Sequence, residues 1–395
     1  MRRLQQAGYE AYIVGGSVRD LILGKVPKDY DVATDATPEE VKVVFPRCRL
    51  IGRRFRLAHV RIEGVLVEVA TFRGQQQSDH HTHADGRILR DNVWGSLEED
   101  AIRRDFTINS LFMDPISGDI RDFTGGYDDL AERKLRLIGD PETRYREDPV
   151  RLLRAARFVA KLGVEPVRST KAPMRELAPL LESIPPARLF EEVCKLFLTG
   201  HARRTIEALQ RFGLTLSLFP VLKAKGGGGK AECGELLQQA MLNTDERIEQ
   251  LRSVTPAFLF AALLWQPVRD RSAKLMEQGL TEFQALFQAG DEVLSEQVRR
   301  TAIPRRFSAV TRQIWEMQAR FRRTRGKRAM SVMRQPRFRA GYDFLLLRAA
   351  EDESLVELGE FWTQAQKDYV PSASTTPPRK KRRRRRRRKN SAGGN

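Results

Sequence analysis

Cysteine is scarce in this sequence, which has three in 395 residues, at positions 48, 194 and 233. They lie far apart and form no paired motif, so neither a disulfide framework nor a zinc knuckle is predicted, and a reducing compartment fits. Long hydrophobic runs are missing as well. The longest, residues 257–265, is much shorter than the roughly 20 residues of a membrane-spanning helix, and residues 1–6 lack the apolar stretch of a signal peptide. We therefore expect a soluble, cytoplasmic protein that does not bind membranes.

Acidic residues are outnumbered by basic ones. The chain has 70 Lys and Arg against 51 Asp and Glu, a formal net charge of +19. Eleven of the cations are consecutive, from Arg379 to Lys389, and follow a stretch rich in Pro, Ser and Thr at 371–378. Without that run the chain still has a net charge of about +8, which favours a polyanionic partner. Nucleic acid is the leading candidate and an anionic membrane surface the second.

The pattern of residues changes along the chain. Runs at 11–14, 30–33, 57–62 and 65–72 are typical of strands and predict a small mixed β-sheet with flanking helices before residue 125. From about residue 149 the strand pattern fades, and segments such as 150–162, 189–198 and 340–347 have helical periodicity. We predict the α+β fold class: an N-terminal head with a small mixed sheet, then an all-α region, then a disordered basic tail from residue 371.

A candidate site for phosphoryl transfer lies in the predicted sheet. Asp29 and Asp31 are two residues apart, and on one strand both would face the same side with Cα atoms roughly 6.5–7 Å apart. Gly15 and Gly16 join a predicted strand to a short helix, where backbone amides can approach a phosphate. Glu68 interrupts an apolar strand, where a carboxylate is costly unless paired or metal-bound. Three acids on neighbouring strands beside a glycine turn suit displacement with two Mg²⁺ ions. Alternatively, the acid pair is a solvated turn and Glu68 an edge residue.

Four motifs in this order resemble a known family. Residues 14–25, VGGSVRDLILGK, and residues 27–41, PKDYDVATDATPEEV, are similar to the head of the class II nucleotidyltransferases, which include CCA-adding enzymes and bacterial poly(A) polymerases. Residues 103–109, RRDFTIN, and the ED-x-x-R pattern at 147–151 resemble two further motifs of that family. The resemblance spans roughly residues 8 to 365.

The resemblance implies roles for individual residues. Asp29 and Asp31 would bind the catalytic metals, and Asp105 would either complete the carboxylate site or hold the ribose and nearby arginines. The catalytic candidates are therefore Asp29, Asp31, Asp105 and Glu68. The nucleotide-binding candidates are Gly15, Gly16 and Arg19 for phosphates, Arg103, Arg104 and Asn109 for triphosphate or ribose, and Glu147, Asp148, Arg151 and Arg154 in the motif that reads the base.

One segment separates two activities within the family. Residues 50–60, LIGRRFRLAHV, resemble the segment that marks bacterial poly(A) polymerases rather than CCA-adding enzymes, as do 185–192, 243–245, 256–265 and 326–329. This implies an enzyme that adds AMP from ATP to RNA 3′ ends without a template, as in mRNA polyadenylation that promotes turnover. Two Mg²⁺ ions would serve, with Mn²⁺ able to substitute. A CCA-adding enzyme and a non-catalytic RNA-binding protein on the same scaffold are the alternatives.

The resemblance also suggests partners and an organisation. Substrates would be the 3′ ends of mRNA, small RNAs and tRNA-like molecules, RNA-degradation proteins would be partners, and the chain would be a monomer. We expect a catalytic head at 1–135, a helical neck with the base-reading motif at 136–200, a helical body with an RNA-binding region at 201–370, and the tail at 371–395.

Candidate RNA-binding residues lie in two basic segments. Residues 320–328 interleave cations with an aromatic, as in surfaces that hold an RNA backbone, although a solvated helix face is a close alternative. The tail would bind phosphates as a flexible arm. The candidates are Arg322, Arg323, Arg325, Lys327, Arg382 and Arg385. Two other features are weak candidates for functional sites. The histidines at 80, 81 and 83 fit a mobile polar loop better than a metal site. The glycines at 226–229 fit a flexible insertion better than a phosphate loop.

Overall fold

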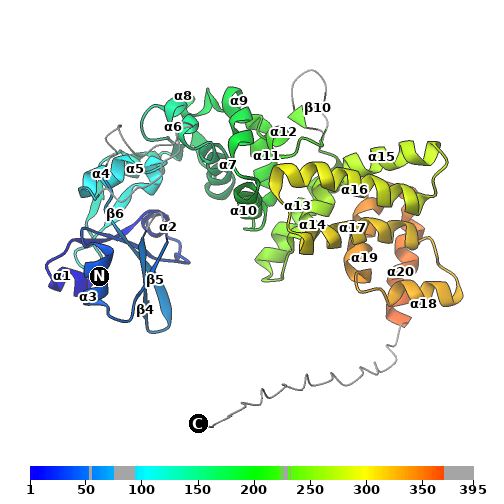
Figure 1. Ribbon diagram of the computed structural model, residues 1–395, viewed down its shortest axis with the longest axis horizontal. Coiled ribbons are helices and arrows are strands. Elements are labelled where there is room, and N and C mark those ends of the chain that lie inside the picture. Colours follow the sequence, from blue (N-terminus) through cyan, green and yellow to red (C-terminus); the bar gives the residue numbers. More distant parts are fainter. Residues whose placement is uncertain (53–55, 75–93, 223, 226–229, 232, 369–395) are drawn as a thin grey trace, which may run out of the picture.

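The computed structural model describes residues 1–52, 56–74, 94–222, 224–225, 230–231 and 233–368. The described elements form an open arch, with the mixed sheet at one end and helices α18 to α20 at the other (Figure 1). The predicted α+β class is confirmed. The glycines at 226–229, the histidines at 80, 81 and 83, and the tail with Arg382 and Arg385 lie outside the described residues. None of the helices in these ranges is long and apolar enough to cross a membrane.

A seven-stranded mixed sheet forms the head, in the order β3-β4-β5-β2-β1-β6-β7. Its only parallel pair joins β2 to β5, and the other neighbours are antiparallel. The strands are β1 (Ala11–Val14), β2 (Asp31–Thr34), β3 (Arg49–Ile51), β4 (Leu57–Ile62), β5 (Val65–Thr71), β6 (Leu111–Met113) and β7 (Ile120–Asp122). Short helices flank the sheet: α1 (Arg2–Gln6), α2 (Gly16–Ile22), α3 (Pro38–Val44), α4 (Leu97–Ile102) and α5 (Gly126–Ala131).

Local sequence explains several of these boundaries. The β4–β5 hairpin turns at Glu63 and Gly64, both with positive φ, as a tight hairpin turn requires. Helix α3 begins at a capping box in which Thr37 and Glu40 satisfy each other's backbone N–H groups, and α4 begins in the same way. The predicted strands at 11–14 and 57–62 are confirmed. The strand predicted at 30–33 begins one residue later, at Asp31, so Asp29 lies before it.

Helices make up most of the described residues after position 140. They are α6 (Pro141–Glu147), α7 (Val150–Leu162), α8 (Arg168–Lys171), α9 (Met174–Leu177), α10 (Pro186–Phe197), α11 (Ala202–Phe212), α12 (Thr215–Leu218), α13 (Glu235–Glu249), α14 (Pro256–Leu263), α15 (Trp265–Glu277), α16 (Glu282–Thr301), α17 (Arg305–Arg320), α18 (Gly326–Met333), α19 (Phe338–Ala349) and α20 (Val356–Asp368). The predicted helical region is confirmed, with the addition of two short strand pairs. The two-residue strand β8 (Lys134–Leu135) pairs with β9 (Glu165–Pro166), and β10 (Ala224–Lys225) pairs with β11 (Lys230–Ala231).

One hydrophobic cluster extends from part of the sheet into the helices after it. Ile13 of β1, Phe106 and Leu152 of α7 are all buried in the same cluster, which continues into α10 and α17. Phe106 packs edge-to-face against Phe158, with ring centroids 5.5 Å apart. This packing fixes α7 against the segment that carries residues 103–109, so two of the sequence motifs are held side by side.

Candidate active site

The carboxylates at the centre of the sheet come from adjacent strands. Asp31, the first residue of β2, lies opposite Glu68 in the parallel β2–β5 register and opposite Val14 in the β1–β2 register. Gly15 follows Val14, so the register brings the glycine turn, Asp31 and Glu68 together. The predicted placement of three acids on neighbouring strands holds for Asp31 and Glu68. It is wrong for Asp29, which lies in a bend before β2, so the strand spacing does not apply to the pair.

Like charges act on Asp31. Burial raises the pKa of its carboxyl, Glu68 and Asp29 raise it further, and Arg104 lowers it in part. Each raising influence penalises the ionised form, because it removes water or adds negative charge nearby. A cation bound at these oxygens would relieve that repulsion.

Glu68 is less constrained than the sequence suggested. Its side chain is 48% exposed and lies 3.3 Å from His59 Nε2, across the β4–β5 pair. The sequence predicted that a carboxylate here is costly unless it is paired or metal-bound. His59 supplies a partner, and this end of β5 reaches solvent, so the cost is small.

The glycine turn packs closely against the 103–109 motif. Gly15 has a φ of +72°, and a Cβ there would lie 3.5 Å from both Arg104 Nη1 and the Asn109 carbonyl oxygen. Arg104 donates to Asp100 at 2.7 Å, and its guanidinium lies 4.9 Å from the centroid of the Phe112 ring. Arg104 thus lies beside both Gly15 and Asp31, where a triphosphate would meet metal-binding oxygens and a cation together.

A chain of polar contacts joins α2 to α7. Arg19 Nη1 donates to Asn109 Oδ1 at 2.6 Å, Asn109 Nδ2 donates to Asp105 Oδ1 at 3.1 Å, and Arg154 Nε donates to Asp105 Oδ2 at 2.6 Å. Arg19 also donates twice to Asp20. A Cβ at Gly16 would lie 3.4 Å from Arg19 Nη2, so the glycine leaves room for this guanidinium.

Asp105 sits within this chain. Burial alone would raise its pKa, but Arg154, Asn109 and the backbone N–H of Phe106 outweigh burial and hold the pKa below its usual value. Asp105 is therefore ionised and engaged on both oxygens. Of the two placements that the sequence left open, the geometry puts Asp105 with the arginines rather than with Asp31.

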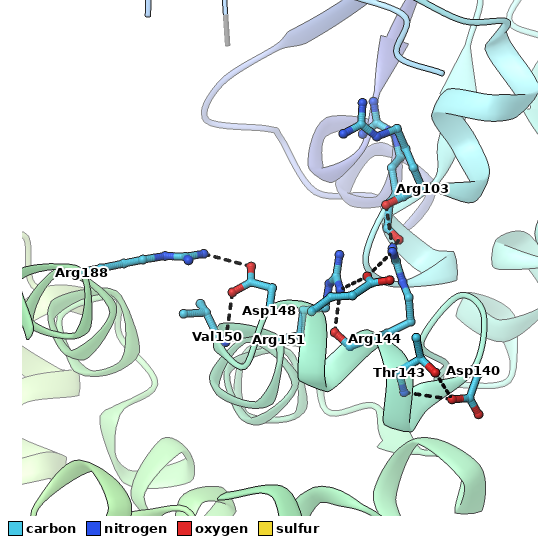
Figure 2. A network of polar contacts seen from close by, with 10 residues as sticks. Arg103, Asp140, Thr143, Arg144, Asp148, Val150, Arg151 and Arg188 are labelled. Carbon is cyan, nitrogen blue, oxygen red and sulfur yellow. Dashed lines mark hydrogen bonds and ion pairs between the residues drawn. The ribbon is translucent and has the colours of Figure 1, made fainter. Parts of the chain in front are cut away.

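The ED-x-x-R motif at 147–151 forms a compact network at the start of α7 (Figure 2). Arg151 Nη1 donates to Glu147 at 2.9 Å and to the carbonyl oxygen of Arg144 at 2.6 Å. Arg144 donates to Glu147 at 2.8 Å and to the carbonyl oxygens of Arg103 and Arg104 at 2.7 Å each. Glu147 thus bridges two arginines, and Arg144 ties the motif to the head.

Two residues of this region were missed from the sequence. Arg144 carries a signal only in its spacing, three residues before Glu147 on α6. Arg188 of α10 donates to Asp148 Oδ2 at 2.9 Å, while Asp148 Oδ1 accepts from the Val150 N–H at 3.3 Å. Figure 2 shows Arg188 reaching Asp148 from a separate helix. Arg188 lies in residues 185–192, a segment that resembles bacterial poly(A) polymerases, but no motif or spacing in the sequence predicts its contact with Asp148.

Four of the predicted RNA-binding cations, Arg322, Arg323, Arg325 and Lys327, lie between α17 and the first turn of α18. Helix α18 is at the opposite end of the arch from the sheet (Figure 1). Arg322 is paired with Glu282 at 2.6 Å. Arg323, Arg325 and Lys327 are exposed, and within the described ranges none of their side chains has a hydrogen-bond or ion-pair partner. The structure therefore does not bring these cations to the carboxylates.

The donor set fits a magnesium ion that also binds substrate. Among the residues that the structure describes, no three His, Cys, Asp or Glu side chains form a ready-made metal-binding group. Mg²⁺ is commonly held by one or two carboxylates together with substrate phosphates and water. Asp29 and Asp31 are oxygen donors of that kind and both reach solvent. Partial burial of the Asp31 carboxyl, together with the nearby acids Glu68 and Asp29, raises its pKa.

Comparisons with known proteins agree with this geometry. Three family models match: the poly A polymerase head domain at 11–136, the probable RNA and SrmB-binding site of polymerase A at 163–225, and the polymerase A arginine-rich C-terminus at 278–391. Poly(A) polymerase I of Salmonella typhimurium is 48% identical over 379 residues, which cover 93% of this chain and 82% of that protein. The chain belongs to the poly(A) polymerase I family. Poly(A) polymerase I of Haemophilus influenzae is 46% identical, with coverage of 93% and 83%.

CCA-adding enzymes are more distant relatives. That of Geobacillus thermodenitrificans is 39% identical over 241 residues, 61% of this chain and 56% of that protein. The solved Bacillus stearothermophilus CCA-adding enzyme in complex with CTP is 27% identical, with a TM-score of 0.52 and coverage of 93% and 97%. A tRNA nucleotidyltransferase complexed with a primer tRNA and an ATP analogue has a TM-score of 0.61 at 20% identity, with coverage of 93% and 98%, which shows a common fold. The predicted choice of poly(A) polymerase over CCA-adding enzyme is confirmed.

Proposed function

We propose that this nucleotidyltransferase adds AMP from ATP to RNA 3′ ends without a template, using Asp29 and Asp31 as ligands for divalent metal. The observation that carries the proposal is the position of Asp31, which lies between Glu68 and the glycine turn and beside Arg104, in a chain of this family. Two Mg²⁺ ions, for which Mn²⁺ can substitute, would activate the attacking hydroxyl and steady the triphosphate.

The reaction is one in-line displacement. The RNA 3′ oxygen bonds to the α-phosphorus of ATP, the bond from that phosphorus to the α–β bridging oxygen breaks, and pyrophosphate leaves. Arg104 would neutralise charge on the triphosphate, and the Gly15–Gly16 turn would let backbone amides approach it. Arg19, Asn109, Asp105 and Arg154 would hold the 103–109 segment in place through their chain of contacts.

Adenine would be read by the network around α7. Its edge presents one ring acceptor and one amino donor, which match the Arg151 guanidinium and a carboxylate of Glu147 or Asp148. Each of these groups already has a partner, Arg151 with Glu147 and Asp148 with Arg188. Hydrogen bonds to the base would therefore replace some of these existing contacts, in a network whose side chains are already in place. Arg103 would complete the ribose or triphosphate contacts.

The remaining parts of the proposal concern substrates and organisation. RNA would be held by Arg322, Arg323, Arg325 and Lys327 in the body (201–370) and by Arg382 and Arg385 in the tail (371–395), with catalysis in the head (1–135) and base reading in the neck (136–200). The substrates would be mRNA, small RNAs and tRNA-like ends in the cytoplasm. The chain would act as a monomer, with RNA-degradation proteins as partners.

One assay tests the function. Purified protein is incubated with Mg²⁺, a generic single-stranded RNA and each of the four nucleoside triphosphates singly, and product length is read on a gel. ATP alone should give a long, heterogeneous tail. A short addition of fixed length that depends on CTP would support the CCA-adding alternative instead, and no addition with any nucleotide would leave an RNA-binding protein on this scaffold.

A further inference from the structure

A cavity of about 430 Å³ opens among α16, α17 and α18, in the part of the arch farthest from the head (Figure 1). Pockets that hold small molecules have volumes of about 300–1,000 Å³. The side chains that matter here are Phe283, Arg320, Arg323, Arg328, Ser331 and Gln335. Arg320, Arg323 and Arg328 belong to the basic segment at 320–328 that the sequence pointed to, whereas Phe283, Ser331 and Gln335 lie outside it.

Positive charge dominates the cavity. Arg320 is held by Glu316 at 3.5 Å and by Gln335 at 3.4 Å. Within the described part of the chain, neither Arg323 nor Arg328 has an acidic partner. The acid Glu282, close by on α16, is already taken by Arg322. An anion in the cavity would therefore meet two uncompensated guanidinium groups, which suit the geometry of a phosphate.

A flat surface lies beside these cations. The Arg320 guanidinium carbon is 5.2 Å from the centroid of the Phe283 ring, in a cation–π arrangement. Nucleobases stack on aromatic rings and on guanidinium planes with little regard to sequence. Ser331 and Gln335 add hydroxyl and amide groups that can bond a base or a ribose. An acidic peptide would need the cations but would gain little from the flat surface, so a nucleotide fits the whole lining better.

We propose that this cavity binds one nucleotide unit of the RNA substrate far from its 3′ end, with the phosphate on Arg323 and Arg328 and the base against Phe283 and Arg320. The inference rests on the proposed function, because it takes RNA as the substrate. The cavity and the carboxylates lie at opposite ends of the arch (Figure 1). Only an RNA long enough to span them is held at both points, and such two-point binding strengthens affinity without any additional interaction at either site. The enzyme therefore favours long RNAs.

The test uses the full chain and single-stranded oligo(A) primers from 6 to 60 nucleotides. The cavity variant is Arg323→Ala with Arg328→Ala. Its matched control is Arg334→Ala with Arg337→Ala, which removes the same charge from exposed positions outside the lining. For the longest primers the KM of the cavity variant should rise about ten-fold with kcat unchanged, against a change within about two-fold in the control. For the 6-nucleotide primer, wild type and both variants should agree.

Two further measurements separate the contributions of phosphate and base. The slope of log affinity for the 60-mer against log salt should fall by about 0.7 for each phosphate that the cavity variant no longer neutralises. Phe283→Leu keeps apolar volume but removes the flat ring, and it should raise KM for long primers without changing the salt slope.

Several results would overturn the proposal. They are a cavity variant that matches its control at every primer length, a reduction of equal size at all lengths, and free AMP that binds wild type at the cavity as tightly as the 60-mer does. Unchanged RNA parameters together with abolished binding of an acidic protein would assign the cavity to that protein. If the wild type adds no AMP to any primer, the proposed function fails by itself, and anisotropy with the labelled 60-mer still tests the cavity.

Discussion

Arginines of the head and neck are paired with acids, whereas several arginines at the C-terminal end have no acidic partner among the described residues. Arg104 is paired with Asp100, Arg154 with Asp105, and Arg151 with Glu147. Around α18, by contrast, Arg323 and Arg328 have no acidic partner within the described ranges. The first arrangement holds the side chains in place before the substrate binds, and catalysis requires the reacting groups to be held in one geometry. The second supplies charge without fixed geometry, as binding of many RNA sequences requires.

The same contrast holds for the acids. In the head, Glu68 and Asp29 repel the ionised carboxylate of Asp31, and Arg104 offsets this repulsion only in part. Near the cavity, the acids Glu282 and Glu316 neutralise neighbouring arginines. Uncompensated negative charge thus lies where metal would bind, and uncompensated positive charge lies where phosphates would bind.

The largest effect should come from the acids of the head. Asp31→Asn, and separately Asp29→Asn, should reduce AMP addition by about 1,000-fold or more, because each removes a charged metal ligand. Asp128→Asn, an exposed acid on α5, is the matched control and should keep wild-type rates. Single-turnover addition to a labelled primer is the measurement. Near-normal addition by either head variant would refute its role as a ligand.

Breaking the chain of polar contacts around Asp105 should cost both stability and rate. Asp105→Asn removes the charge that faces Arg154, and the partly buried guanidinium is left without its counter-charge. We expect a decrease of about 2–3 kcal/mol in the free energy of unfolding, somewhat below that for breaking a fully buried pair, and a rate about 100-fold lower. Urea denaturation and initial rates measure the two. A fall in rate with unchanged stability would instead point to direct contact between Asp105 and substrate.

The pH dependence should follow Asp31. Its pKa is raised on folding, so the folded protein gains stability as the pH falls and loses it as the pH rises through that pKa. Without metal at neutral pH, Asp31→Asn should therefore be slightly more stable than wild type. Glu68→Gln removes one source of repulsion and should shift the acid limb of the activity profile to lower pH. A shift to higher pH would contradict the assigned influence of Glu68.

A smaller effect is expected at Arg188. In its pair with Asp148, Arg188 is exposed and Asp148 is partly exposed, so Arg188→Ala should change stability by less than about 1 kcal/mol. The freed carboxylate can then accept from the amino group of either adenine or cytosine, and the preference for ATP over CTP should fall about three-fold. Arg204→Ala on α11 is the control. Unchanged selectivity would show that Arg188 does not position Asp148 for base reading.

The smallest effect on chemistry should come from the tail. Deleting residues 378–395 removes the run from Arg379 to Lys389, including Arg382 and Arg385. If about five phosphates are contacted, the salt slope for single-stranded RNA should drop by roughly 3–4, and products should shorten. The chemical step on a bound primer should stay the same. Equal slopes of log affinity against log salt for the full-length and the truncated protein would show that the tail does not bind RNA.

Local patterns were enough to predict much of the head. The strand at 57–62 and the helix at 150–162 have the predicted bounds, because alternation and helical periodicity are properties of consecutive residues. The turn at Gly15 was also predicted, since glycine is the residue that its positive φ favours. The strand predicted at 30–33 begins at Asp31, so Asp29 lies two residues before it, in a bend, and the spacing of a strand does not apply to the two acids.

Long-range contacts account for what the sequence did not predict. Arg144 binds two backbone carbonyl oxygens that lie 40 and 41 residues away in the chain, and carbonyl groups carry no sequence signal. Arg188 reaches Asp148 across 40 residues. The cavity depends on Phe283 of α16 lying against Arg320 of α17. These pairings follow from helix packing, which spacing along the chain does not specify.

The most direct test of the site is to locate the metal. Crystals of the protein with Mn²⁺ and a non-hydrolysable ATP analogue allow the ion to be placed by its anomalous signal. We predict Mn²⁺ at about 2.1 Å from carboxylate oxygens of Asp29 and Asp31, as for a hard cation on oxygen ligands, with the triphosphate beside Arg104 and the adenine against Arg151. Mn²⁺ bound at Glu147 and Asp148 instead, with none at Asp31, would contradict the assignment of the active site.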